Sequence, residues 1–415
     1  MDTPLITSDA VTFGLLMAIL AAIFITSHSD DPRWKKFYKF VPSLLLCYFI
    51  PSLLTTFGIV SEADSNLYYV ASRYLLPASL VLLTLSIDLK GIINLGPKAV
   101  IMFLAGTLSI MFGGPIAILI IGTISPEIIG GTGPEEVWRG LATIAGSWIG
   151  GGANQTAMLE IYEPSTDLFG AMVTVDIIVA NIWMAFLLYG AGISSKVDSW
   201  FKADASAIDE LKQNIADYQS SIARVPTLVD FTKIMAIAFS LVALGHLAGD
   251  FIAPWITDNA PNLSRLSLNS PFFWIIVVAT TGGLILSFTK ARKLEGAGAS
   301  KLGSLFLYIL VMTIGMKMNI ASMLDAPGYF IIGAVWILIH VIILLVVGKF
   351  IKAPFFFVAV GSQANVGGAA SAPIVASAFH PALAPVGVLL AVLGYALGTY
   401  GAWLSAEMMR IVSGF

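Results

Sequence analysis

The chain has 415 residues, of which 57% are hydrophobic and only 11% are charged. Soluble domains carry about 25% charged residues, so this composition excludes a water-soluble globular protein and indicates that the bilayer surrounds most of the chain. The net charge of −3 gives no sign of a nucleic-acid partner, and the single cysteine, Cys47, excludes an intramolecular disulfide.

Long apolar runs follow one another along the chain, and a spanning helix needs about 20 such residues. The acidic residues before the first run differ from the basic start of a cleaved signal peptide, so the first run is expected to remain as a helix. The sequence predicts an all-α polytopic membrane protein with about ten spans. The predicted spans cover residues 10–27, 37–58, 73–93, 99–123, 168–190, 229–252, 271–289, 302–321, 328–350 and 383–409.

Two further apolar runs, residues 138–158 and 354–377, are rich in glycine and carry amide side chains where lipid favours leucine. The first includes GSWIGGGANQTAM and the second includes VGSQANVGGAASAPIVA. Glycine adopts backbone angles that other residues resist, but irregular backbone at membrane depth must be buried in protein or line a wet cavity. These runs predict broken helices or hairpins, and close helix packing through small residues is the alternative.

The charge distribution of the short loops orients the chain, because Lys and Arg accumulate on the cytoplasmic side. Basic loops at residues 28–39, 90–98, 289–301 and 349–352 are therefore expected to face the cytoplasm. These loops agree with one another only if the first glycine-rich run returns to the external side from which it entered. This favours two re-entrant hairpins that enter from opposite sides over two additional spans.

The two halves of the chain share the order of their elements, which predicts inverted repeats over residues 1–193 and 227–415. The segment VLLTLSIDLKGIINLGPKA of the first half resembles ILVMTIGMKMNIASMLDAP of the second. Repeats of an odd number of spans in opposite orientation are typical of many secondary transporters. The register of the hairpins stays open, because their Gly-Ser pairs match in one alignment and Asn154 matches Asn365 in another.

A polar stretch, residues 194–226, connects the two repeats. Apolar residues recur along it at helical spacing, with polar residues between them. This pattern predicts an amphipathic cytoplasmic linker helix that lies on the membrane surface or on the protein.

The glycine-rich runs are expected to meet in the middle of the bilayer and to enclose a binding site. Interrupted helices expose carbonyl oxygens that coordinate a cation such as Na⁺, and helix N-termini that hold a carboxylate. The candidate ion-binding or substrate-binding residues are Gly151, Gly152, Asn154, Gln155, Thr156, Asp176, Asn181, Ser362, Gln363, Asn365, Gly367, Gly368 and Ser371. The sequence has no His, Cys and carboxylate cluster typical of a catalytic metal, so no cofactor is expected, and Na⁺ is the expected coupling ion.

Asp176, in VTVDIIVAN, is the clearest acid well inside an apolar run, and Asn181 lies on the same helix. Ionisable residues inside the membrane are functional candidates by default. We therefore expect Asp176 to bind an ion or carry a proton, and a satisfied structural carboxylate is the alternative. Asn154, Asp176 and Asn365 are the expected Na⁺ ligands.

The segments GSWIGGGANQTAM, VTVDIIVAN and VGSQANVGGAASAP resemble the bacterial YjcL-like integral membrane proteins, domain-of-unknown-function family 819, and the resemblance covers nearly the whole chain. More distantly, the layout resembles the superfamily of cation/proton antiporters, bile-acid–sodium symporters and glutamate–sodium symporters. This resemblance implies an inverted-repeat secondary transporter of the bacterial inner, or cytoplasmic, membrane, often a homodimer. In such a transporter, a core with the broken elements slides against a scaffold.

The leading functional prediction is Na⁺-coupled symport of a small polar or anionic organic solute by elevator-like alternating access. Sodium is favoured over protons because the runs are rich in neutral oxygens and the site has one acid rather than a pair. A cation/proton antiporter that uses Asp176 is the alternative within the same class. A channel and an intramembrane enzyme are alternatives of other classes. An enzyme is not expected, because no well-placed base accompanies Ser147 or Ser362.

Overall fold

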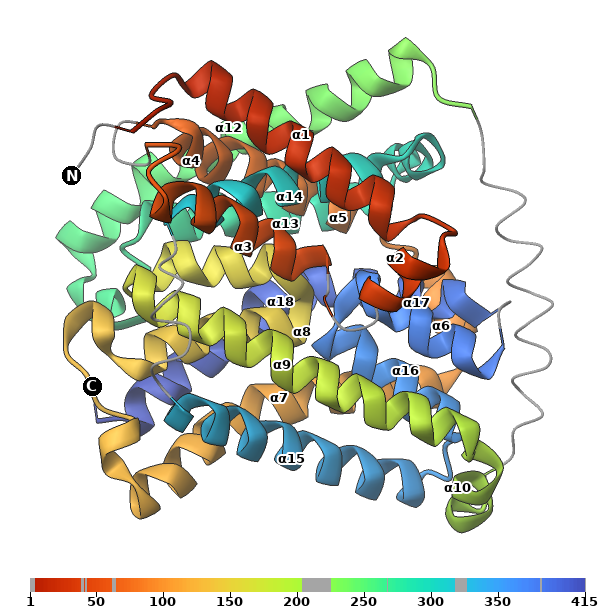
Figure 1. Ribbon diagram of the computed structural model, residues 1–415. Helices are drawn as coiled ribbons and strands as arrows, with labels where there is room; N and C mark the ends of the chain where they lie inside the picture. Colours follow the sequence, from red (N-terminus) through yellow and green to blue (C-terminus); the bar gives the residue numbers. More distant parts are fainter. Residues whose placement is uncertain are drawn as a thin grey trace.

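The computed structural model describes residues 4–38, 41, 43–61, 65–203, 225–266, 268–317, 327–380 and 383–414. Within these ranges the secondary structure is helical (Figure 1), apart from an isolated bridge between Ile6 and Val60. Most of the linker helix predicted for residues 194–226 lies outside the described residues. Its described start is the short helix α10 (Ser194–Phe201).

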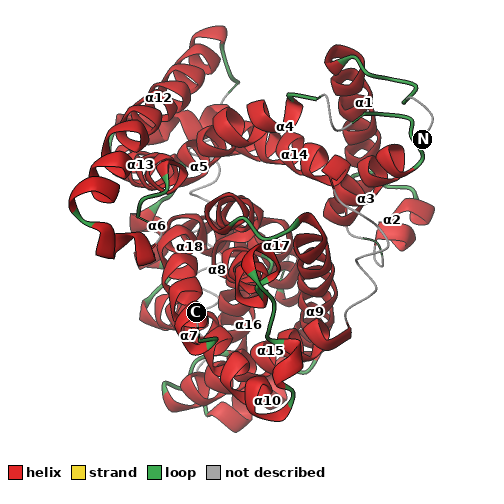
Figure 2. Cartoon of the chain, turned by 90° about the vertical axis from the view of Figure 1, so that its left-hand side faces the viewer, coloured by secondary structure: helices red, strands yellow, loops and turns green. Residues whose placement is uncertain are grey.

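The helices gather into two groups, an arc and a bundle, that pack against each other (Figure 2). The arc contains α1 (Asp9–Ser27), α3 (Ser43–Thr56), α4 (Leu67–Val70), η1 (Ala71–Leu75), α5 (Leu76–Leu85), α12 (Leu228–Asn259), α13 (Pro271–Ser287) and α14 (Ala299–Lys317). The bundle contains α7 (Pro97–Ile124), α8 (Val137–Tyr162), α9 (Thr166–Gly192), α15 (Pro327–Phe350), α16 (Phe355–Val366), α17 (Gly368–Phe379) and α18 (Ala384–Val412). In each half of the chain the arc helices come first and the bundle helices follow, so the two halves have the same order of elements.

Eight helical segments of the described chain are long and apolar enough to cross a membrane. Two bent pairs add to them: α2 (Pro32–Tyr38) meets α3 at 82°, and α13 meets η5 (Lys290–Ala297) at 96°. The total is up to 10 if each bent pair is one span, in agreement with the sequence-based count. Neither bent pair is one of the glycine-rich runs, whose geometry is different.

One span predicted from the sequence is displaced. The prediction places it at residues 73–93, whereas the continuous helical segment is Leu67–Leu85. The difference arises at Asp88, which lies outside that helix and accepts a hydrogen bond from the Gly91 N–H as the N-cap of a new short helix, α6 (Leu89–Asn94). Asp is among the preferred N-cap residues because its carboxylate satisfies a free helical N–H.

A proline inside α7 explains one contact between α7 and α18. Pro115 has no N–H, so the carbonyl of Met111, one turn earlier, loses its helical donor. The hydroxyl of Ser405 in α18 donates to this carbonyl at 2.9 Å. The proline therefore creates an acceptor inside the bundle, and the neighbouring helix supplies the donor.

Candidate functional site

The first glycine-rich run folds back on itself within α8. Gly151 has a φ of 73° and a ψ of −174°, a combination that glycine alone adopts readily, and it reverses the chain. A Cβ at Gly146 would lie 2.5 Å from the carbonyl oxygen of Asn154, so the two arms pack backbone against backbone. At the open end, Arg139 Nη1 donates to the carbonyl of Tyr162 at 2.7 Å. The run is therefore a hairpin, called hairpin 1 below.

The second glycine-rich run forms hairpin 2 from α16 and α17. The two helices meet at Gly367 and Gly368, and Gly368 has a φ of 59°. The ring centroid of Phe379, at the end of α17, lies 6.1 Å from that of Phe355 and 5.3 Å from that of Phe356, at the start of α16. The beginning and the end of the run thus lie side by side, as they do in hairpin 1.

The reversals decide the register between the two hairpins. Matching the Gly-Ser pairs brings the reversal at Gly151 opposite Val366, next to the reversal of hairpin 2. Matching the two Asn residues brings Gly151 opposite Ser362, inside the first arm. The structure therefore favours the Gly-Ser match. As a consequence, Asn154 lies on the second arm of its hairpin, whereas Asn365 lies on the first arm.

Helix α9 runs between the open ends of the two hairpins (Figure 1). Just before its start, the Ser165 N–H donates to the carbonyl of Pro134, which lies just before hairpin 1. Near its end, a Cβ at Gly190 would lie 2.5 Å from the ring of Phe355, the first residue of hairpin 2. A helix of 27 residues is about 40 Å long, so the open ends lie far apart. The hairpins therefore enter the bundle from opposite ends.

The two reversals meet inside the bundle. A Cβ at Gly368 would lie 3.7 Å from the Cα of Gly151. Helix α18 crosses at the same point, since a Cβ at Gly394 would lie 2.9 Å from the carbonyl oxygen of Ile149 and 3.6 Å from that of Ala364. The absence of a side chain at Gly394 lets α18 touch the backbone of both hairpins.

The side chain of Asn154 joins hairpin 1 to α18. Its Nδ2 donates to the carbonyls of Gly150 and Tyr395, both at 3.0 Å. Its Oδ1 accepts a hydrogen bond from Thr399 at 2.7 Å. The side chain is fully buried, so these contacts position the second arm of hairpin 1 against the crossing helix.

The side chain of Asn365 makes the same kinds of contact between hairpin 2 and α7. Its Nδ2 donates to the carbonyls of Gly361 at 2.9 Å and Phe103 at 3.0 Å. Its Oδ1 accepts a hydrogen bond from Thr107 at 2.8 Å. Each hairpin is thus held by one asparagine that bonds a carbonyl four residues back, a carbonyl of a crossing helix and a threonine of that helix.

Asp176 of α9 is buried and faces hairpin 1. Trp148 Nε1, on the first arm, donates to its Oδ1 at 2.6 Å, and Gln155 Nε2, on the second arm, donates to its Oδ2 at 2.9 Å. The hydroxyl of Ser147 also interacts with this carboxylate. Asp176 forms no ion pair with any residue in the described ranges. The carboxylate therefore connects both arms of hairpin 1 to α9 through neutral donors.

A chain of hydrogen bonds through His340 of α15 joins hairpin 2 to α7 and α9. Trp183 Nε1 donates to Ser362 Oγ at 2.8 Å, and Ser362 lies 2.7 Å from His340 Nε2. His340 Nδ1 lies 2.6 Å from Ser109 Oγ, which donates to the carbonyl of Gly106 at 2.7 Å. A neutral imidazole with its proton on Nδ1 satisfies every group in this chain. The expectation that no base accompanies Ser362 is therefore wrong, because His340 Nε2 lies beside its hydroxyl. The remaining hydrogen bonds give both residues structural partners within the bundle.

Gln363 differs from the other amides of the hairpins that the structure describes, because its buried Oε1 has no hydrogen-bond partner. Its Nε2 donates to Ser371 Oγ across the reversal at 2.7 Å. The amide lies against Gly367, the N-cap of α17, and no side chain in the described ranges caps that helix. Most buried polar groups have a partner, so this unpaired oxygen beside a helix N-terminus is the clearest ligand signal in the site.

The other predicted site residues have partners within their own helices. Thr156 Oγ1 donates to the carbonyls of Gly152 at 3.1 Å and Ala153 at 3.0 Å. Asn181 Nδ2 donates to the carbonyl of Ile177 at 2.7 Å. In the part of the chain that the structure describes, no group of three or more His, Cys, Asp or Glu side chains is placed to hold a metal ion.

Three residues that hold the site were not among the predicted ones: Trp148, Trp183 and Thr107. Thr399, a polar residue of the last helix, makes the matching contact to hairpin 1. Each threonine directly follows a glycine of a crossing helix, in Gly106-Thr107 and Gly398-Thr399. The glycine allows the close approach and the threonine supplies the hydroxyl, so this pair was the available signal. Trp148 lies among glycines, where an indole offers a single well-directed donor.

Two comparisons with known proteins bear on this chain. Residues 14–412 match a family model described as a protein of unknown function, DUF819. The chain is also similar to the uncharacterized membrane protein YjcL of Bacillus subtilis (strain 168), with 23% identity over 422 aligned residues that cover 97% of this chain and 99% of that protein. Both matches include the arc, the bundle and the two hairpins. The chain is therefore a multi-pass membrane protein that belongs to the DUF819 family.

Proposed function

We propose that the protein is a secondary active transporter that moves a small polar or anionic organic solute by Na⁺-coupled symport. The observation that carries this proposal is the contact between Gly151 and Gly368, the reversals of two hairpins that enter the bundle from opposite ends. Paired interruptions that meet within the membrane are typical of secondary transporters, whereas a channel or a scaffold protein has no need of them.

The charge distribution at the reversals supports solute binding. Helix α17 begins at one reversal, and the second arm of hairpin 1 begins at the other, so two helix N-termini lie close together. Helix N-termini carry partial positive charge and free N–H groups, which favours a carboxylate or another small anion. Gly151, Gly152 and Gly367 are partly exposed, so a solute can approach the backbone there.

The same region supports a cation site. The first arm of hairpin 1 and α16 end at the reversals, and helix C-termini carry partial negative charge. We assign the coupling ion to this place, with Gln363 Oε1 as a ligand because it is buried and unpaired. Ser371 Oγ and backbone carbonyls complete the oxygen set. Asn154 and Asn365 then act as positioning residues, since their amides already bind the crossing helices.

In this proposal the arc is the scaffold and the bundle is the moving core of an elevator-like transporter. The contacts of α9 support a rigid core, because two residues of this one helix, Asp176 and Trp183, bind hairpin 1 and hairpin 2 respectively. The proposed setting is the cytoplasmic membrane of a bacterium, with the chain as a homodimer.

A cation/proton antiporter is the second candidate, and the buried carboxylate of Asp176 favours it. This activity needs no organic solute. Proteoliposomes that exchange cations for protons without added solute, and lose this exchange in Asp176→Asn, would support the antiporter over the symporter.

Sodium dependence of stability tests the leading proposal. A ligand that binds only the folded state adds about 2.7 kcal/mol of stability at 100 times its Kd, so NaCl should raise the unfolding temperature of the purified protein above that in KCl or choline chloride. Gln363→Leu should abolish this increment. The control Asn181→Ala, whose amide bonds its own helix among the described residues, should keep it. No sodium-specific increment in the parent would reject sodium coupling, and a solute screen under a Na⁺ gradient would then identify the cargo.

A further inference from the structure

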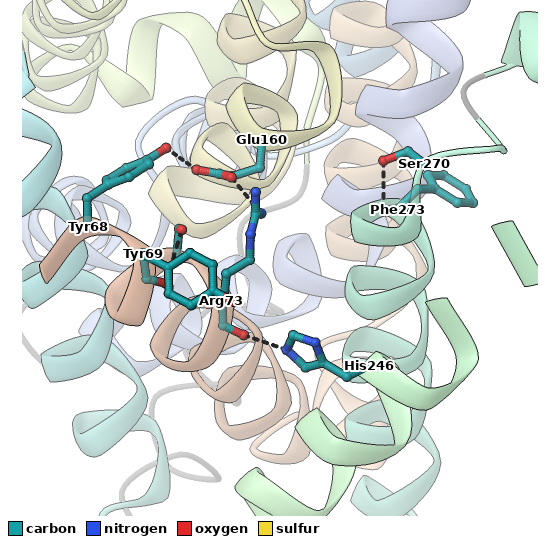
Figure 3. Close-up of polar contacts among 8 residues, drawn as sticks. Tyr68, Tyr69, Arg73, Glu160, His246, Ser270 and Phe273 are labelled. Atoms are coloured by element: carbon teal, nitrogen blue, oxygen red, sulfur yellow. Dashed lines mark hydrogen bonds and ion pairs between the residues drawn. The ribbon is translucent and has the colours of Figure 1, made fainter. Parts of the chain in front are cut away.

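We propose that Glu160 of hairpin 1 is a latch that holds the bundle to the arc and must release before the bundle can move. Glu160 lies near the open end of the hairpin and is buried. Arg73 Nη1 of η1 donates to its Oε2 at 2.7 Å, and the hydroxyl of Tyr68 in α4 donates to its Oε1 (Figure 3). The carboxylate therefore belongs to the bundle, whereas both of its donors belong to the arc.

The arc holds the two donors in place through its own contacts. Arg73 lies in a π-helical turn, a distortion that is frequent at functional sites. His246 Nε2 of α12 donates to the backbone carbonyl of Arg73 at 3.0 Å, and the guanidinium lies 4.6 Å from the ring centroid of Phe272 in α13. The ammonium of Lys317 lies 4.0 Å from the ring centroid of Tyr68. The arc thus presents a built receptor for the carboxylate.

A second buried carboxylate shows what the same chemistry does inside the bundle. Glu407 of α18 accepts a hydrogen bond from the Tyr162 hydroxyl at 3.0 Å and pairs with Arg410 at 2.8 Å. A tyrosine and an arginine thus bind it, as they bind Glu160, and its exposed fraction is 4%, close to the 7% of Glu160. All three members of this set belong to the bundle. Glu407 therefore stabilises the bundle, whereas Glu160 connects it to the arc.

The burial of Glu160 makes the latch effective. Sliding the bundle along the arc separates Glu160 from Arg73 and leaves a buried carboxylate without its partner, which is costly. The contact between the two groups, here called the seam, also contains two neutral hydroxyl pairs between α13 and α18. Thr281 lies 2.5 Å from Tyr400, and Thr280 lies 3.0 Å from Thr399. Neutral hydroxyls exchange partners at lower cost than charges, so the ion pair between Glu160 and Arg73 contributes more than the hydroxyls to holding arc and bundle together.

A cysteine reporter in the seam tests the latch. In a Cys47→Ala background, Thr281→Cys places a single thiol where α13 meets α18, and a water-soluble maleimide measures how often the seam opens. Glu160→Gln should raise the labelling rate by at least about tenfold, because the amide cannot form the ion pair. The matched control Glu407→Gln should change the rate by less than about twofold, because it acts within the bundle.

A milder variant keeps the test decisive if Glu160→Gln does not fold by gel filtration. Tyr68→Phe removes one donor and should raise labelling by about threefold. Unchanged labelling in the folded latch variants, or an equal rise in Glu407→Gln, would overturn the latch. The inference rests on the proposed function in that arc and bundle move relative to each other. The assay contains no solute and no Na⁺, so a failed latch leaves the sodium test untouched, and a failed sodium test leaves the labelling result standing.

Discussion

Replacement of Asn154 by alanine separates positioning from ligand binding. The buried amide donates to the carbonyls of Gly150 and Tyr395 and accepts from Thr399. Each of these three hydrogen bonds contributes about 1 kcal/mol net, so Asn154→Ala should lower the free energy of unfolding by about 3 kcal/mol. Asn154→Asp should cost more, because a carboxylate cannot donate and would face two carbonyl oxygens in a buried site.

The measurement is SDS-induced unfolding in mixed micelles, followed by tryptophan fluorescence. Asn181→Ala is the control, because within the described chain its amide bonds the Ile177 carbonyl of its own helix, and it should lose less than about 0.5 kcal/mol. The stability added by NaCl should be the same in Asn154→Ala as in the parent. Equal stability of the two alanine variants would refute the positioning role. Loss of the NaCl increment would make Asn154 an ion ligand instead.

Two further predictions concern the backbone of the bundle. Gly151→Ala should lower the unfolding free energy by about 1–3 kcal/mol, because a side chain is strained at a φ of 73°. The neighbouring change Gly152→Ala should alter the unfolding free energy by less than about 0.5 kcal/mol. Equal losses of the two variants in SDS unfolding would contradict a chain reversal at Gly151. Ser405→Ala should cost about 1–2 kcal/mol because the carbonyl of Met111 loses its donor. In a Pro115→Ala background the restored N–H should remove most of the cost of Ser405→Ala. Additive effects of the two substitutions in a double-mutant cycle would contradict this explanation of the contact.

The membrane class and most helices could be predicted because run length and hydropathy directly reflect the thickness of the bilayer. The runs predicted at 10–27 and 328–350 each differ from α1 and α15 by one residue. The displaced span shows the limit of this signal, since hydropathy alone does not register that Asp88 caps a new helix. The hairpins could be anticipated because only glycine tolerates the backbone of a reversal such as that at Gly151.

The partners within the site could not be predicted, because they arise where distant segments cross. Asn154 bonds a threonine 245 positions away, and Asn365 bonds one 258 positions away. The sequence identifies the two amides as candidate ion ligands, which stays a prediction, and the structure adds protein partners that sequence spacing does not indicate. The contacts of Glu160 could not be predicted either, because its donors Tyr68 and Arg73 precede it by 92 and 87 positions.

The chemical groups at the contact between the hairpins determine how ligand binding there should depend on pH. At Gly151 and Gly368 the protein offers peptide groups, and the side chains beside Gly367, Gln363 and Ser371, carry an amide and an alcohol. None of these groups gains or loses a proton in the physiological range. Asp176, which contacts Trp148 and Gln155 of hairpin 1, is an ionisable side chain close to this place. Under the proposed function, a pH profile of solute affinity in Asp176→Asn would therefore trace the ionisation of the solute itself, and its midpoint would give the acid strength of the solute.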